Sequence, residues 1–227
     1  VSGTYTVTAT AGNIIDSGTL AITGLATLTT SASGADIELD QTGSTFAAGI
    51  SLNTTGSTGD AVVDNGTNAL IIAASFLGGN LNLTSGNASG ITDSGIVTVG
   101  GDFSATTDAN NGDIDMETLA VTGTITLTTN DDANNNTGHA TVVNATQVAL
   151  TASSVDGNLA VTATTGDMTD TGSLIVTSTS SFTTSATDAD IILDSTTNRF
   201  IGTVTVNTLG AGGDAEIHGG STALGII

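Results

Sequence analysis

The chain has no cysteine, proline, tryptophan or lysine, and Arg199 is its one strongly basic residue. Without cysteine it has no disulfide framework and no thiol chemistry. Its 22 acidic residues against that one arginine give a formal net charge of −21. Because such a surface repels nucleic acid and anionic lipid, we expect neither of them as a partner.

Two further absences concern targeting and order. No run of about 18 apolar residues is present, so we expect no membrane span. The chain opens without the basic and apolar stretches of a secretory signal, so we expect a removed leader or a piece of a longer protein. High net charge with only 3% aromatic residues can indicate disorder, but 38% of the residues are hydrophobic and only 10% are charged. That balance favours an ordered protein.

What the chain does contain is one unit written three times. The motifs Asp16-Ser17-Gly18, Asp93-Ser94-Gly95 and Asp170-Thr171-Gly172 follow one another at equal intervals. The first and third copies align without a gap, and the middle copy needs small shifts. Such a pattern is typical of a stacked array rather than a globule with one unique centre. The period divides one continuous body into three repeats, residues 1–77, 78–154 and 155–227.

Within each repeat, apolar and polar residues alternate over short stretches such as residues 5–9, 36–40 and 124–128. A period of two gives a strand one buried and one exposed face, and Val, Ile and Thr suit the pleated surface. Clusters of Gly, Asn, Asp and Ser, as at residues 55–60 and 130–138, are typical of turns. No sustained stripe with a period of 3.6 residues occurs, so we expect essentially no helix.

These short strands predict an all-β protein, a parallel β-solenoid. With three faces per coil, each repeat would make three to four coils of roughly 19 to 26 residues, stacked about 4.8 Å apart. Nine to twelve coils would form a rod on the order of 45–60 Å long. A string of small sandwiches is the alternative, although sandwiches usually carry an aromatic centre. We expect apolar ladders on equivalent coils inside the solenoid, formed by Ile37, Ile114 and Ile191 and, two residues on, by Leu39, Met116 and Leu193.

The two ends of the chain fall inside the repeat. Residues 223–227 match residues 69–73, so the chain is three repeats less about three residues. A solenoid needs caps to cover its open edges, and no polar capping segment is visible in the sequence. We therefore expect a window on a much longer protein, or a subunit that stacks head to tail.

The phrases NLAVTATTGDMTDTGSLIVT at residues 158–177 and ADIILD at residues 189–194 resemble the repeats of giant bacterial surface exoproteins of the filamentous haemagglutinin type. The resemblance covers all 227 residues. It implies a right-handed parallel β-helix, secretion to the cell surface, and a role as adhesin, stalk or fibre. The secretion domain and receptor-binding tip of that family are not in this chain, so no binding specificity is carried over.

Many parallel β-helices cleave polysaccharides, with paired carboxylates as acid and base. Glutamate occurs here only as Glu38, Glu117 and Glu216, and no Ser/His/Asp arrangement recurs. A catalytic site would also interrupt the repeat with long loops, and none is evident. We therefore predict no catalytic residue and no enzyme activity. The other repeats have no basic residue at the positions equivalent to the chain's one arginine and two histidines, Arg199, His139 and His218.

A calcium site is a further alternative. Residues 56–63 and 210–217 resemble the Gly-Gly-x-Gly-x-Asp motif of calcium-binding β-rolls, but that motif must recur every nine residues. Residues 108–115 are rich in oxygen ligands, yet they lack the Glu that closes an EF-hand loop. We expect turns at all three places, and we predict no metal-binding or cofactor-binding residue. Ca²⁺ stays as an alternative with a weak signal.

The recurring Asp-Ser/Thr-Gly motif predicts a turn in which Asp accepts backbone N–H groups and Gly takes a positive φ. Because it recurs in every copy, we interpret it as part of the scaffold. Glycosylation sequons also occur, and we place Asn82 in a strand and Asn65 and Asn135 in turns where a glycan would fit. The full set of sequon asparagines is Asn53, Asn65, Asn82, Asn87, Asn135 and Asn144.

From these patterns we predict a secreted, extracellular rod at the cell surface, the shaft of a fibre or adhesin. Its partners would be itself, head to tail, or neighbouring repeats of the same chain, with surface glycans as a further candidate. Lack of lysine would deny trypsin-like proteases most cleavage sites. The alternatives are a calcium-stabilised β-roll adhesin and a carbohydrate-binding or carbohydrate-cleaving β-helix.

Overall fold

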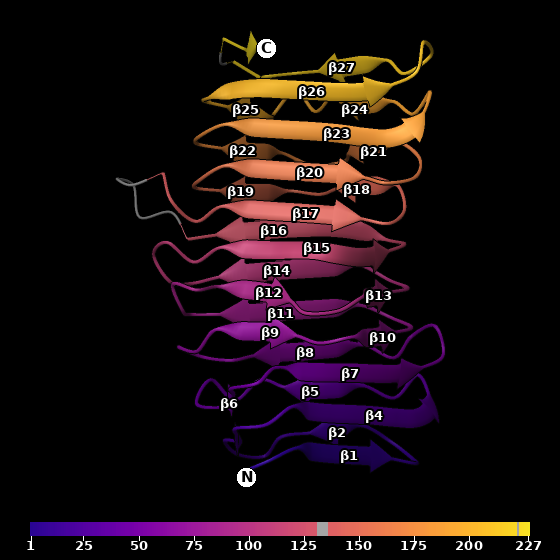
Figure 1. Ribbon diagram of the computed structural model, residues 1–227, viewed down its shortest axis with the longest axis vertical. Helices are drawn as coiled ribbons and strands as arrows, with labels where there is room; N and C mark the ends of the chain where they lie inside the picture. Colours follow the sequence, from indigo (N-terminus) through magenta and orange to yellow (C-terminus); the bar gives the residue numbers. More distant parts are fainter. Residues whose placement is uncertain (131–135, 222) are drawn as a thin grey trace.

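In the computed structural model, which describes residues 1–130, 136–221 and 223–227, the chain coils around one long axis (Figure 1). Every regular element in these residues is a strand, and each strand pairs in parallel with strands one turn away. About ten turns separate β1 from β28, and the two termini lie at opposite ends of the stack. The prediction of a parallel β-solenoid is confirmed, and the string of sandwiches is excluded. The right-handed sense stays a prediction.

One broad sheet of 13 strands runs along the whole length of the molecule. We call it sheet A. Its strands are short because clusters of Gly, Asn and Ser interrupt the alternating pattern after a few residues. They are β1 (Tyr5–Ala9), β4 (Ala26–Ser33), β7 (Ile50–Thr55), β9 (Leu70–Ile72), β10 (Ser75–Leu77), β12 (Ile91–Asp93), β13 (Val97–Val99), β15 (Ile114–Val121), β17 (Ala140–Asn144), β20 (Leu159–Ala163), β23 (Ser180–Thr187), β26 (Thr203–Leu209) and β28 (Gly225–Ile226).

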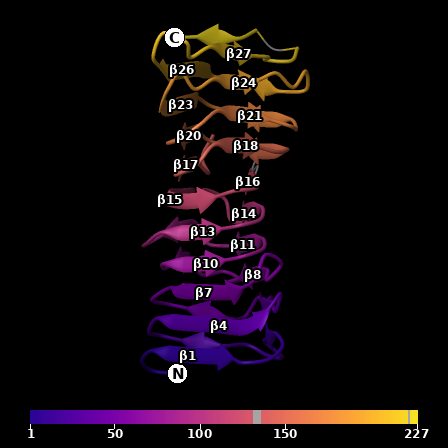
Figure 2. The same ribbon diagram turned by 90° about the vertical axis from the view of Figure 1, so that its right-hand side faces the viewer.

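A second sheet of 13 strands, sheet B, faces the first across the interior (Figure 2). A third sheet pairs only β3 (Ala21–Ile22) with β6 (Thr45–Phe46). The strands of sheet B are β2 (Ile14–Ile15), β5 (Ile37–Leu39), β8 (Ala61–Asp64), β11 (Leu81–Ser85), β14 (Phe103–Thr107), β16 (Thr124–Thr129), β18 (Val148–Leu150), β19 (Ser153–Val155), β21 (Met168–Asp170), β22 (Leu174–Val176), β24 (Ile191–Leu193), β25 (Arg199–Phe200) and β27 (Ala215–Ile217).

Most of the solenoid has two broad faces rather than the three that we expected. The third segment of a coil continues one of the two sheets after a short break. Thus β9 and β10 both pair with β7, where Ile72 lies beside Ile50 and Phe76 beside Asn53. Because two short strands share one longer neighbour, the described residues form no third sheet that extends along the rod.

The expected coil length is confirmed. Residues at equivalent places in neighbouring coils lie between 19 residues apart, as for His139 and Asn158, and 26 residues apart, as for Asp113 and His139. At about 4.8 Å per turn, about ten turns give a rod on the order of 48 Å long.

Each repeat makes three and a half turns, so successive repeats begin on opposite sides of the solenoid, which the sequence did not reveal. Along sheet B, seven steps lead from β2 to β21, which are equivalent strands two repeats apart. Successive repeats therefore present the same residues on opposite faces. Ile37 and Ile191 lie in sheet B, whereas Ile114 lies in sheet A. Our expectation of a single ladder on equivalent coils was wrong in this respect.

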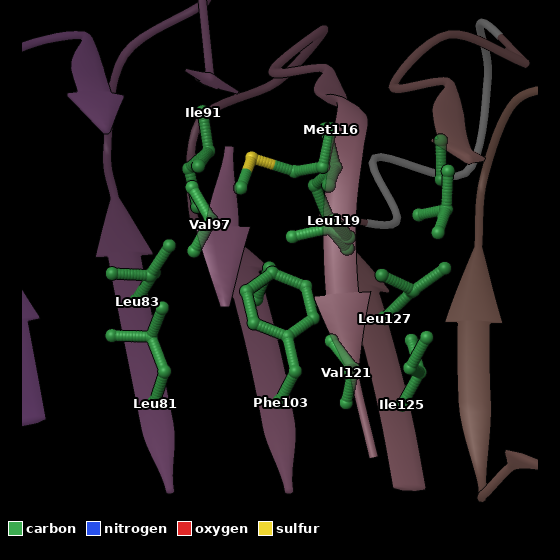
Figure 3. Packing of buried hydrophobic residues seen from close by; sticks show 14 of the residues in the cluster. Leu81, Leu83, Ile91, Val97, Phe103, Met116, Leu119, Val121, Ile125 and Leu127 are labelled. Atoms are coloured by element: carbon green, nitrogen blue, oxygen red, sulfur yellow. The ribbon is translucent and has the colours of Figure 1, made fainter. Parts of the chain in front are cut away.

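The interior between the sheets is apolar and closed along its length. Figure 3 shows Leu81, Phe103 and Ile125 from sheet B meeting Val97 and Val121 from sheet A. All the residues that we expected in the ladders are buried, with at most 1% of their surface exposed. Near the C-terminal end the rings of Phe182 and Phe200 pack edge to face at 5.7 Å, and they join the two sheets.

Buried threonines close several of the arcs that connect the sheets. In these arcs a threonine hydroxyl donates a hydrogen bond to the carbonyl oxygen five residues later. Thr30, Thr107 and Thr184 do so at 2.9, 2.8 and 3.1 Å, and they occupy the same position in the three repeats. This bond satisfies a carbonyl group that the sheets leave unpaired.

Candidate functional site

Side chains at the corners of the solenoid form ladders along its axis. At the entrance to a sheet B strand, a carboxylate or amide Oδ1 accepts the backbone N–H of the equivalent residue one coil later. The donor–acceptor distances lie between 2.6 and 3.0 Å. The longest of these ladders runs through Asn13, Asp36, Asp60, Asn80, Asp102 and Thr124.

Two further ladders follow the same rule. In sheet A, Asp113 accepts the N–H of His139, whose Nδ1 accepts the N–H of Asn158, and Asn158 accepts the N–H of Thr179. In sheet B, the third ladder ends at Asp214, whose N–H donates to Asp190 at 2.8 Å. The described residues donate no hydrogen bond to the Asp214 carboxylate.

The ladders give His139 and the corner aspartates a structural role as hydrogen-bond acceptors between coils. His139 takes the place of Asp60 and Asp214 and serves as an acceptor in the way that Asp60 does. The backbone and hydroxyl hydrogen bonds from Thr124 lower the pKa of Asp102, because they stabilise its ionised form. We missed these ladders in the sequence, although the signal was present as an Asx residue directly before the first inward residue of many strands.

The Asp-Ser/Thr-Gly motif has the structural role that we expected, with one correction. Asp93 accepts the N–H and the hydroxyl of Thr118, each at 2.7 Å. The glycines of the motif do not have a positive φ. Their requirement is space, because a Cβ on Gly172 would lie 2.4 Å from the backbone nitrogen of Ala152 in the coil beneath. Gly18 in the first coil has no such neighbour.

The buried aspartates of this motif differ in their hydrogen-bond partners between the third repeat, which has Asp170, and the first, which has Asp16. Asp170 is 8% exposed, and its Oδ2 accepts a hydrogen bond of 2.6 Å from the side chain of Asn198. Asp16 is equally buried, but its Oδ2 has no hydrogen-bond partner among the described residues. The residue equivalent to Asn198 in the first repeat is Ser44, whose hydroxyl instead accepts the N–H of Leu20.

The structure does not bring together the residues that we considered for catalysis. The three glutamates lie in different strands, Glu38 in β5, Glu117 in β15 and Glu216 in β27. Arg199 is exposed in β25. The Glu216 carboxylate lies 3.7 Å from the imidazole of His218, and both side chains are exposed near the C-terminal end.

Each segment that we considered for calcium consists of an arc and the first residues of the strand that follows it. Residues 108–112 form a tight arc that the Thr107–Gly112 hydrogen bond closes. Asp115 is exposed in β15, but partial desolvation, followed by the negative charges of Asp93 and Asp113, raises its pKa. In the part of the chain that the structure describes, no group of three or more His, Cys, Asp or Glu residues has the geometry of a metal site.

The sequons fall into two groups. Asn65 and Asn144 are fully buried, and their side-chain amides donate to backbone carbonyl groups. Our expectation that a glycan would fit at Asn65 was wrong, because this asparagine accepts the N–H of Phe46 inside the corner. Asn82 is exposed in β11, and Asn135 lies outside the described residues.

The apolar interior opens only at the two ends of the described structure. The residues of the core cluster are buried along the rod, whereas those packed against it at either end are partly exposed. A hollow of about 560 Å³ at the N-terminal end is lined by Tyr5, Val7, Ile14 and Leu20. At the C-terminal end the partly exposed residues are Val206, Ile217 and Leu224.

In the part of the chain that the structure describes, no helix has the length and apolar character needed to cross a membrane. Searches of curated proteins and of solved structures gave no significant match to the chain. The sequence profile of one family matches three successive segments, residues 1–53, 58–128 and 137–207, which together cover most of the chain. The chain therefore belongs to the family described as "Repeats of unknown function (DUF5649)".

Proposed function

We propose that this chain is a structural rod of the extracellular cell surface, the shaft of a fibre or an adhesin of the filamentous haemagglutinin type. The observation that carries the proposal is the continuity of the two sheets, each of which links 13 strands from one end of the molecule to the other. Every coil is held to the next by hydrogen bonds on both faces. The product is a long and narrow body in which both sheets run from repeat to repeat.

The corner ladders support the same role. In each ladder a side chain of one coil accepts a backbone N–H of the next, which adds a third line of axial hydrogen bonds to those of the two sheets. These bonds lie at exposed or partly buried corners, so each contributes modestly, on the order of 0.5–1 kcal/mol. Such bonds resist the separation of neighbouring coils, which is what a shaft under tension requires.

The surface composition suits an exposed position outside the cell. The chain carries 22 acidic residues and one arginine, so neighbouring rods repel one another and a trypsin-like protease finds a single site. That site, Arg199, lies in β25 and is paired with Ile175 of the neighbouring strand. We expect a folded rod to withstand trypsin at the cell surface.

Labelling of intact cells tests the proposal. An antibody raised against this chain should label unpermeabilised cells of the source organism and decorate extended structures in electron micrographs. Trypsin should leave the label in place, and proteinase K, which needs no lysine or arginine, should remove it. Label that appears only after permeabilisation, and that proteinase K cannot reach on intact cells, would refute a surface location.

A further inference from the structure

We propose that Asn82 is a glycosylation site, at which a sugar is joined to the side-chain amide nitrogen on the outer face of sheet B. The residue belongs to the tripeptide Asn82-Leu83-Thr84, which has the Asn-X-Ser/Thr pattern of acceptors for N-linked glycans. A chain as rich in threonine as this one forms that pattern by chance, so the pattern alone selects none of the sequon asparagines. The structure separates them by what each side chain already does.

Two of the sequon asparagines are closed to modification because the corners of the solenoid enclose them. Asn65 and Asn144 are fully buried, and the amide nitrogen of each donates to backbone carbonyl groups. A sugar on that nitrogen would need the space that the surrounding residues fill. The two asparagines also occupy equivalent places in the first and second repeats, so we interpret them as part of the scaffold.

Two others are partly exposed, but their amide groups already make hydrogen bonds. Asn87 donates to a backbone carbonyl oxygen at 2.8 Å, and its Oδ1 accepts a backbone N–H at 2.9 Å. Asn53 donates to the hydroxyl of Ser51 at 3.2 Å. The third repeat has an asparagine at the place of Asn53, Asn207, which donates to a threonine hydroxyl in the same way. A sugar on either amide would disturb contacts that the fold uses.

Among the sequons that the structure describes, Asn82 alone has a side chain that is exposed and makes no hydrogen bond with the described residues. The hydroxyl of Thr84, two residues further on the same face of β11, is free of such bonds as well. The scaffold does not need an asparagine here, because the equivalent residues are Thr6 in the first repeat and Ala160 in the third. Asparagine is also unfavourable within strands, so its presence at this one place favours a role other than packing.

The surroundings of Asn82 leave room for a sugar. Successive residues of a strand point to opposite faces, so Leu81 and Leu83 are buried in the core while Asn82 points outward. The residues paired with Asn82 in the neighbouring coils are Val62 and Ser104, whose side chains are short. A sugar ring on the Asn82 amide therefore projects into solvent without displacing a core side chain.

The modification is a glycosyl transfer from a sugar that is activated through a phosphate ester. The Nδ2 nitrogen of Asn82 forms a bond to the anomeric carbon of the sugar, the bond from that carbon to the phosphate oxygen breaks, and the amide nitrogen gives up a proton. The cell supplies the activated sugar and the transferase. The chain supplies the acceptor amide and the Thr84 hydroxyl that the acceptor pattern requires, and it gains a bulky, solubilising group on its surface.

Mass spectrometry of the protein purified from its source organism tests the assignment. Peptides that cover residues 77–99 should carry the mass of a sugar on Asn82, and the variants Asn82→Gln and Thr84→Ala should lose it. Thr106→Ala is the matched control and should keep the sugar, because Thr106 pairs directly with Thr84 in the next coil but belongs to no sequon. An unmodified peptide from the unchanged protein would overturn the proposal, and so would a sugar that persists in Asn82→Gln because a hydroxyl carries it.

A transfer reaction with purified protein tests what the fold contributes. The folded chain, expressed in a host that adds no sugar, receives a nucleotide-activated hexose and a transferase that recognises Asn-X-Ser/Thr. Of the described sequons we expect only Asn82 to be modified, whereas short peptides that each cover one sequon should all accept the hexose. Transfer to the other described sequons of the folded chain, or none to Asn82, would overturn the assignment. Either failure leaves the proposed rod standing, because the two sheets do not depend on a sugar.

Discussion

Replacement of Ser44 by asparagine should stabilise the protein, because it repeats an arrangement that the third repeat already contains. There, Asn198 accepts the N–H of Leu174 at 2.8 Å and donates to the Oδ2 of Asp170 at 2.6 Å. In the first repeat, Ser44 accepts the equivalent N–H at 3.0 Å but makes no hydrogen bond to the Oδ2 of Asp16. The Ser44→Asn variant keeps the first bond and adds the second.

The magnitude follows from the burial of the carboxylate. Asp16 is 7% exposed, and its Oδ2 has no hydrogen-bond partner among the described residues. A hydrogen bond to a charged group contributes about 1.5–3 kcal/mol, and fixing the longer side chain costs part of that gain. We expect Ser44→Asn to raise the free energy of unfolding by about 1–2 kcal/mol. The reverse exchange, Asn198→Ser, should lower it by about 2–3 kcal/mol, because it strands the Asp170 carboxylate.

Urea unfolding and hydrogen exchange measure these effects. Long repeat arrays can lose two-state cooperativity, so exchange of peptides that cover residues 14–46 and 168–200 locates each change in its own coils. Backgrounds without the carboxylate, Asp16→Ala and Asp170→Ala, serve as controls. The reasoning fails if Ser44→Asn does not stabilise the chain, or if either exchange has the same effect with and without its aspartate.

Three other predictions concern single sites. Asp115→Asn should stabilise the protein slightly at pH 7, because partial desolvation and the carboxylates of Asp93 and Asp113 raise the pKa of Asp115. The gain is small, since Asp115 is exposed and solvent screens its charge. Unfolding curves should show the advantage fading as the pH falls through that raised pKa to the ordinary value of 3.8. Thr107→Val should cost about 1–3 kcal/mol in urea, because it orphans a buried carbonyl, whereas Thr6→Val on the surface should change stability by about 0.5 kcal/mol or less. Gly172→Ala should lower the melting temperature through a clash with the coil beneath, whereas Gly18→Ala should leave it nearly unchanged, since a Cβ there meets nothing within 4 Å.

The coil length and the inward residues could be predicted from the sequence because both depend on local pattern. Alternation with a period of two determines which residues of a strand share a face, so Ile37 and Leu39 were assigned to the interior correctly. The turn clusters then limit the length of each strand. Together these two signals determine how many residues make one turn, to within the observed range.

The corners were harder to predict, because their chemistry depends on the coil above or below. Asn65 sits among turn residues and looked exposed, yet it is fully buried and accepts the N–H of Phe46 from a neighbouring coil. One signal could have identified it. Asn144 stands at the equivalent place in the second repeat, also two residues before a threonine, and it is buried in the same way.

The repeat period could not predict that successive repeats place equivalent strands in opposite sheets. A period in sequence does not specify the rotation about the solenoid axis from one repeat to the next. The angle depends on the number of residues per turn, which varies here from 19 to 26. Since Asp16 and Asp170 follow sheet B while Asp93 ends a strand of sheet A, the two sheets accept the same sequence and are physically equivalent. A rod of such repeats carries each outward feature on both sides, and the feature returns to the same side every seven turns, about 34 Å along the axis. A partner that binds one repeat therefore meets equivalent positions on opposite sides of the shaft.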